Sequence, residues 1–280
     1  MSDITIRSLS SLERVDSALW DGLCHGDSPF QKYGFLRALE LSESVGPGTG
    51  WLPQYLLVEE DGELLGACAA YLKTDSYGEY IFDWAWARAS PRFGVSYYPK
   101  LVVAAPFTPA TGNRLLIAPE ADRELVQRAI ASGIVGLCEK HQLSGAHVLF
   151  CTDNEAAALE KLGLARRSSV QYHWHNRDYT SFDEFLAALK SRKRKQIRKE
   201  RSRAQAAVDS IEFVFARDWQ EEDFEALDRF YRKTVAEHGG FDYLRPGFFR
   251  HVAECMSDTV LYCRVINDGV IVAGALFFET

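Results

Sequence analysis

The stretch YLLVEEDGELLGACAAY, residues 55–71, holds two apolar runs joined by Glu60-Asp61-Gly62-Glu63. Asp-Gly between two apolar runs is a strong β-hairpin signal, because both residues tolerate the positive φ angles of a tight turn. A second stretch, VLYCRVINDGVIVAGALFF at residues 260–278, repeats this arrangement around Asn267-Asp268-Gly269. Two helical segments precede each hairpin, and this repeated order predicts two related units in one chain.

The other elements are placed from periodicity and capping residues. In the first unit we expect strands at Ile4–Leu9, Tyr97–Phe107, Gly145–Cys151 and Arg166–His175, and helices at Arg14–Cys24, Tyr33–Glu43, Pro119–His141 and from Asp153 or Asn154 to Gly163. In the second unit we expect a strand at Ile211–Ala216 and helices at Glu221–His238 and Phe248–Met256. The first domain is therefore placed at residues 1–178 and the second at 179–280, opening with a helix capped by Ser181. We expect the second domain to be incomplete, since its hairpin ends close to Thr280.

Composition excludes several classes of protein. The chain has 280 residues, 47% of them hydrophobic and 25% charged, which is typical of folded globular proteins and excludes a disordered chain. No apolar run approaches the length of a membrane span, and the first residues do not resemble a secretory signal. Six cysteines without CxxC spacing favour reduced thiols. We expect a cytoplasmic protein without a membrane span.

Charge is distributed unevenly along the chain. The net charge is −7, yet residues 190–203 hold nine Lys or Arg and one Glu. Like charges four residues apart on a helix repel, and an anionic ligand would relieve that cost. Arg194, Arg198 and Arg201 are therefore predicted to bind an anionic or tRNA-linked substrate by phosphate contact, the alternative being a solvated helix. The run has no aromatic residue for base stacking, and the acidic balance argues against DNA.

The first unit's order of strands and helices resembles the GNAT acyltransferase fold. Several strings resemble the FemAB-like branch linked to peptidoglycan biosynthesis and recognition: Gly50-Trp51-Leu52-Pro53, Gly78-Glu79-Tyr80-Ile81-Phe82-Asp83, Tyr97-Tyr98-Pro99-Lys100-Leu101 and Pro106–Gly112. The resemblance implies an α/β (α+β) fold of tandem GNAT-like domains with mixed, mostly antiparallel sheets. It also implies transfer of an acyl or aminoacyl group to an amine, with a cell-wall or nucleotide-linked precursor as a candidate acceptor.

Two alternative functions stay open beside this resemblance. One is an ordinary small-molecule acyl-CoA N-acetyltransferase, and the other is a non-catalytic module that binds an anionic precursor. We expect no tightly bound cofactor, with acyl-CoA or aminoacyl-tRNA acting as a donor substrate. His173 and His175 share a strand face, but no third ligand is spaced for zinc, so no metal site is predicted.

Candidate catalytic residues lie in two of these strings. In the GNAT fold the central strands part, and free backbone N–H groups there can stabilise an oxyanion. A neighbouring tyrosine could protonate the leaving group; of Tyr97 and Tyr98 we select Tyr98. Glu79 and Asp83 lie among aromatic residues, which can raise a carboxyl pKa and suit it to act as a general base. Lys100 is predicted to bind substrate. The alternative is structural packing and hydrogen bonding.

The loop Pro106–Arg114 is the candidate donor-binding segment. Thr108, Thr111, Gly112 and Arg114 could together hold a phosphate or pyrophosphate through backbone N–H groups and one guanidinium. The usual GNAT pyrophosphate motif has two small residues directly opening a helix, whereas this loop has one Gly followed by Leu115-Leu116-Ile117. The alternative is a rigid loop that ends a strand.

Overall fold

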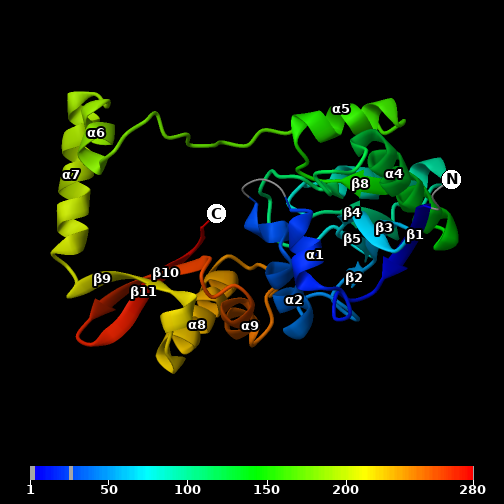
Figure 1. Cartoon of the computed structure of the whole chain (residues 1–280). Helices are drawn as coiled ribbons and strands as arrows, with labels where there is room; N and C mark the ends of the chain where they lie inside the picture. The colour runs from blue at the N-terminus through cyan, green and yellow to red at the C-terminus, as the bar shows by residue number, and fades with distance from the viewer. Residues whose placement is uncertain (1–3, 25–27, 280) are drawn as a thin grey trace.

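The computed structural model describes residues 4–24 and 28–279. The first unit contains β1 (Ile4–Leu9), α1 (Ser17–Gly22), α2 (Tyr33–Leu41), β2 (Trp51–Pro53), β3 (Tyr55–Glu60), β4 (Glu63–Cys68), β5 (Ala70–Lys73), α3 (Trp84–Ala89), β6 (Lys100–Val103), β7 (Leu116–Ile117), α4 (Arg123–Lys140), β8 (Ala146–Val148) and α5 (Asp153–Lys161). The second contains α6 (Phe182–Ala187), α7 (Ser191–Gln205), β9 (Ser210–Phe215), α8 (Glu221–Glu237), α9 (Phe248–Cys255), β10 (Val260–Asn267) and β11 (Val270–Phe278). Figure 1 shows both units.

Both predicted hairpins are confirmed. β3 pairs antiparallel with β4, and β10 with β11. Asp61-Gly62 and Asp268-Gly269 all have positive φ, as the tight turn requires. The strand orders β1-β3-β4 and β9-β10-β11 match, so the internal repeat predicted from the hairpins is also present in the sheets. The domain boundary at residue 178 stays a prediction.

The sheet with order β2-β5-β6-β8 positions the candidate site. β6 and β8 form the one parallel pair among the described strands; the other pairings are antiparallel, as expected. β6 is shorter than the predicted strand at 97–107, because the chain leaves the sheet after Val103. The last bond of this pair runs from the Leu149 N–H to the Val103 carbonyl, at 2.9 Å. The register of this pair ends at Val103 and Val148.

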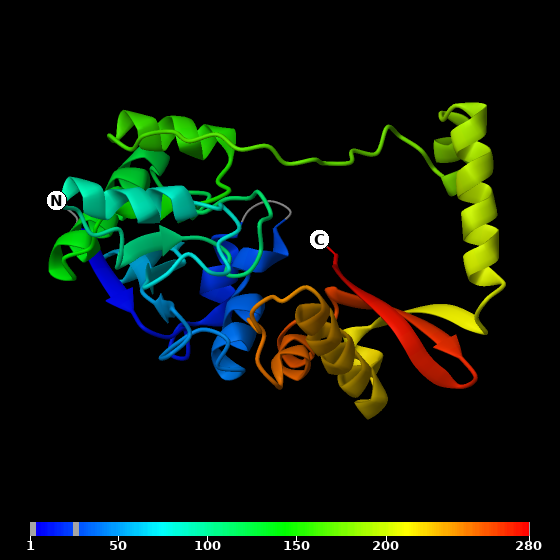
Figure 2. The ribbon, with the colours of Figure 1, turned by 180° about the vertical axis from the view of Figure 1, so that it is seen from behind.

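The prediction of a strand at Arg166–His175 is wrong. This segment has the residue alternation of a strand, but it pairs with no described strand. Val170, Tyr172 and Trp174 are 80%, 97% and 67% exposed. Figures 1 and 2 show the segment crossing from α5 to α6 as an extended connection. Alternation thus identified the local conformation correctly, but a strand also needs a hydrogen-bonded neighbour.

The basic region forms a helix, but not as a continuation of the helix that Ser181 caps. Ser181 does accept the Glu184 N–H. Lys190 then takes an extended conformation, with ψ of 142°, and separates α6 from α7. The apolar positions of α6 therefore do not continue along α7. α7 buries none of its residues, and both views show it projecting away from the first unit.

The two units contact each other through equivalent helices. α2 and α9 are each the last helix before the hairpin of their unit, and Phe35 lies edge-on to Phe248 with ring centroids 6.3 Å apart. A Cβ atom added to Gly34 would lie 2.6 Å from the Cys255 carbonyl oxygen. The Arg245 N–H also donates to Ser44 Oγ at 3.0 Å. Gly34 therefore allows the close approach of the two helices.

Gly34→Ala is expected to lower the free energy of unfolding by about 1–3 kcal/mol, because the added methyl group must displace backbone atoms of the facing unit. Gly136→Ala is the matched control: Gly136 also lies inside a helix, and its Cβ would meet nothing within 4 Å. That variant should gain up to about 1 kcal/mol from helix propensity. Urea denaturation measures both. Equal effects of the two substitutions would contradict a close contact at Gly34.

Candidate active site

Six side chains form what we call the buried lysine cluster: Lys100, Glu79, Asp83, Ser76, Tyr97 and Tyr98. The Lys100 Nζ lies 2.8 Å from Glu79 Oε2, 2.7 Å from Asp83 Oδ2 and 3.2 Å from Ser76 Oγ. The side chains of Lys100 and of both carboxylates have no solvent exposure. The cluster therefore pairs one ammonium group with two carboxylates away from water.

The two tyrosines complete the cluster. The Tyr97 hydroxyl donates to Asp83 Oδ2 at 2.5 Å, and the Tyr98 hydroxyl lies 2.6 Å from Ser76 Oγ. Both tyrosines are half-buried, whereas the other four residues are buried. A substrate approaching the cluster would therefore meet a tyrosine before a carboxylate.

The loop between β5 and α3 aims the carboxylates inward. Gly78, Tyr80 and Phe82 all have positive φ, a conformation that bulky residues rarely adopt. Tyr80 is 40% and Phe82 75% exposed, while the intervening Glu79 and the following Asp83 are buried. Alternating backbone conformation thus turns aromatic rings outward and carboxylates inward. It explains why Glu79 and Asp83 share one site although neither belongs to a strand.

The two carboxylates differ in their pKa values. Burial raises the pKa of Glu79 to about 6, although Lys100 opposes the shift. Burial also disfavours ionised Asp83, but hydrogen bonds from Lys100, Ser76 and Tyr97 outweigh it and hold the pKa of Asp83 below its usual value. Burial and the Asp83 contact raise the pKa of Tyr97. Glu79 Oε1 and Asp83 Oδ1 are buried without a hydrogen-bond partner among the described residues.

Glu79 is expected to make stability depend on pH. Its pKa is raised in the folded chain, so its contribution is largest below pH 4.5 and is lost as the pH rises through about 6. A shift of this size corresponds to about 2 kcal/mol. The difference in unfolding free energy between the wild type and Glu79→Gln should fall by about that amount from pH 4.5 to 6.5. Half-buried His147, whose pKa burial lowers to about 4, acts in the opposite direction and cancels in this difference. A flat difference would contradict the shift.

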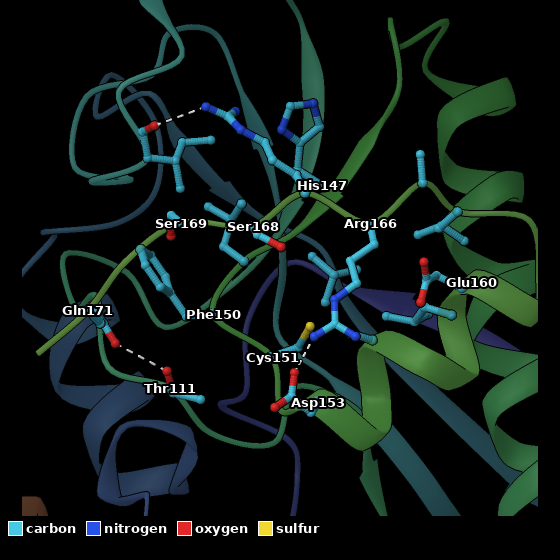
Figure 3. Close-up of a pocket in the computed structure, with 18 of the residues that line it drawn as sticks. Thr111, His147, Phe150, Cys151, Asp153, Glu160, Arg166, Ser168, Ser169 and Gln171 are labelled. Atoms are coloured by element: carbon cyan, nitrogen blue, oxygen red, sulfur yellow. Dashed lines mark hydrogen bonds and ion pairs between the residues drawn. The ribbon is translucent and has the colours of Figure 1, made fainter. Parts of the chain in front are cut away.

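A cleft of about 570 Å³ lies near this cluster, and none of the six cluster residues lines it. It is bounded by β8, α5 and the segment from Leu164 to His173, as Figure 3 shows. Two interactions join residues that line the cleft: Arg166 pairs with Asp153, and the Thr111 hydroxyl donates to the Gln171 side-chain oxygen. His147 lines the cleft, and its ring centroid is 6.0 Å from that of Tyr97. His147 thus connects the cleft to the buried lysine cluster.

The candidate donor loop is occupied by its own hydrogen bonds. Thr108 Oγ1 donates to the Pro106 carbonyl, and the Gly112 N–H donates to the Phe150 carbonyl. Arg114 is fully buried; its guanidinium donates to the Leu149 carbonyl at 2.8 Å and to the Ala110 carbonyl at 2.5 Å. Backbone carbonyl groups of the loop and of the residue that follows β8 therefore hold the Arg114 guanidinium in place. Anion binding by this loop stays a prediction from the sequence.

The arginines of the basic helix lie apart from the cluster. Arg194 donates to the Ala187 carbonyl, Arg198 pairs with Asp183 at 3.1 Å, and Arg201 lies over the ring of Phe182. They therefore form a separate exposed surface. Among the residues that the structure describes, no group of three potential ligands is arranged to hold a metal ion, and no helix has the length and apolar character needed to span a membrane.

The structure brings together Glu79, Asp83, Tyr98 and Lys100, which sequence reasoning had selected separately. It adds Ser76, Tyr97 and His147. Tyr97, set aside in favour of Tyr98, is the tyrosine that binds a carboxylate. Ser76 and His147 belong to no sequence motif that predicts a site. They are identified only by their contacts in the structure, Ser76 with Lys100 and His147 with Tyr97.

A family model described as FemAB-like, peptidoglycan biosynthesis/recognition, matches residues 11–280. The match covers nearly the whole chain, and the chain therefore belongs to the FemAB-like family. Among curated proteins no significant match is found.

Two solved structures have a similar arrangement. One is a crystal structure of FemX, with 13% identity, a TM-score of 0.46 and coverage of 90% of this chain and 56% of that one. The other is a tandem GNAT protein from the clavulanic acid biosynthesis pathway, solved without AcCoA, with 13% identity, a TM-score of 0.45 and coverage of 99% and 75%. The chain thus spans little more than half the length of the FemX chain.

Proposed function

We propose that the protein transfers an acyl or aminoacyl group to an amine and that the buried lysine cluster serves this reaction. The observation that carries the proposal is the hydrogen-bonded series Lys100–Asp83–Tyr97 beside the cleft. Membership of the FemAB-like family supports the same class of reaction. The acceptor is proposed to be a cell-wall precursor.

The cluster can accept the proton that the acceptor amine loses and return it to the leaving group. The acceptor amine attacks the donor carbonyl carbon, forming a C–N bond, and the bond from that carbon to the leaving oxygen or sulfur breaks. The amine proton passes to the Tyr97 oxygen while the Tyr97 proton moves to Asp83. The same path, reversed, returns a proton to the leaving group. Lys100 stabilises the ionised form of Asp83, which is present before the first transfer and is restored by the second.

The basic helix supports an anionic or tRNA-linked donor. The side chains of α7 are not buried, and Arg198 has one exposed ion pair. We propose that phosphate groups bind there, so affinity should fall as salt rises. The six cysteines are free, which supports a reducing, cytoplasmic location.

A transfer assay with the full chain tests this function. Radiolabelled aminoacyl-tRNA and acyl-CoA are offered separately, each with a UDP-linked peptide precursor as the acceptor. We expect label in the acceptor with one donor, and a rate that falls with ionic strength if the donor is tRNA. Turnover with CoA and only small amines would favour a small-molecule acetyltransferase. Ligand binding without turnover would refute catalysis and leave a binding module.

A further inference from the structure

The outer edge of β8 pairs with no strand in residues 4–24 and 28–279. β8 is the last strand in the order β2-β5-β6-β8. Toward β6, the Gly145 carbonyl accepts from the Leu101 N–H and the Leu149 N–H donates to the Val103 carbonyl. Because alternate residues of a strand direct their N–H and C=O groups to opposite sides, those of Ala146 and Val148 face away from β6. They make no hydrogen bond to any described residue.

The cleft runs along this free edge. Ala146, His147, Val148 and the three residues after them all line it. The opposite wall of the cleft is the segment 164–173. Its backbone does not pair with β8, because its side chains contact other parts of the first unit. Arg166 pairs with Asp153, and Arg167 lies over the Trp86 ring, 4.6 Å from its centroid. Gln171 donates to the Pro109 carbonyl. The space between this wall and β8 is therefore bounded on one side by unpaired backbone groups.

A free strand edge selects its ligand by backbone spacing. Half-buried N–H and C=O groups require partners, and an extended peptide presents donors and acceptors at the same interval. The walls of the cleft are mixed: Ala156, Leu159 and Leu164 are apolar, while Ser168 and Ser169 add hydroxyl groups. An extended peptide would direct alternate side chains into such a space.

We propose that the outer edge of β8 binds an extended peptide by strand addition, through the backbone groups of Ala146 and Val148. His147 lies between them, and its ring also packs against that of Tyr97, so the bound peptide would lie one side chain away from the buried lysine cluster. This assignment deepens the proposed function by defining the acceptor, but its test measures binding alone. Binding without transfer would retain the site and refute the function; transfer without peptide binding would do the reverse.

Val148→Pro removes the outward N–H and leaves the bonds to β6, since these belong to Gly145, Leu149 and the intervening His147. Val148→Ala keeps the N–H and is the matched control. The probe is N-acetyl-tetraalanine amide, titrated by NMR. We expect the Ala146 and Val148 amide signals to shift in the wild type and in Val148→Ala, and affinity to fall at least tenfold in Val148→Pro. Equal affinity of the two variants would overturn the proposal.

A second measurement decides the matter even if Val148→Pro does not fold. Peptides N-methylated at either of two neighbouring central residues are titrated against the wild type. Strand addition requires that one methyl group blocks binding and the other is tolerated, because only alternate residues face β8. We expect at least a tenfold difference between the two peptides. Equal tolerance of both methyl groups, or no binding of the unmodified peptide, would refute strand addition.

Discussion

Replacing Lys100 by methionine is expected to lower the free energy of unfolding by about 3–5 kcal/mol. The reason is that two buried carboxylates, Glu79 and Asp83, lose the ammonium group that compensates their charge. Methionine has a similar length and fills the space, so the loss would come from the uncompensated charge more than from a cavity. Urea denaturation at pH 7 measures the change.

Two variants give this expectation its controls. Lys161→Met removes a lysine from the exposed end of α5 and should change stability by less than about 0.5 kcal/mol. Combining Lys100→Met with Glu79→Gln and Asp83→Asn removes all three charges and should recover most of the loss, since neutral groups of matched shape replace a charged network. If Lys100→Met unfolds at the wild-type urea concentration, or the triple variant is no more stable than the single one, the charges of the cluster do not interact as the distances indicate.

Local signals in the sequence were sufficient for the hairpins. Asp61-Gly62 and Asp268-Gly269 determine a turn through their own φ preferences, so no knowledge of distant residues was needed. The segment at 166–175 shows the limit of this reasoning. Its alternation is local information, whereas the presence of a partner strand depends on how the rest of the chain packs. The break at Lys190 was missed for a related reason, since neither Gly nor Pro marks it.

The candidate site was predictable in its parts but not as an assembly. Carboxylates among aromatic residues and a tyrosine pair before a lysine selected four members of the cluster. Their meeting depends on the backbone of the 78–83 loop, where aromatic residues adopt positive φ against their preference. Arg114 shows a second limit: a cation in a Gly-containing loop suggests a ligand site, but the sequence does not show that its guanidinium also binds the Leu149 and Ala110 carbonyl groups, which the fold brings near.

Asp83→Asn is expected to lower kcat of the proposed transfer about 10²- to 10⁴-fold, because asparagine can accept the Tyr97 hydrogen bond but cannot take its proton. Tyr97→Phe should have a similar effect, since it removes the group through which the amine proton reaches Asp83. Single-turnover rates with saturating donor and acceptor measure both. Asp75→Asn is the matched control: Asp75 lies in the same loop and contacts Lys73 at 3.5 Å instead of Lys100, so its rate should stay within about threefold of the wild type.

The pH dependence distinguishes which carboxylate accepts the proton. If Glu79 is the base, kcat should rise with pH around its pKa of about 6, and Glu79→Gln should abolish that rise. If Asp83 is the base, its lowered pKa moves the rise below the ordinary range of aspartate, and the rate should be flat between pH 5 and 7. The tyrosine contact belongs to Asp83, so we expect the flat profile. Wild-type rates in Asp83→Asn and Tyr97→Phe would contradict the assignment to Asp83, and a wild-type rate in Glu79→Gln as well would leave the cluster a purely structural role.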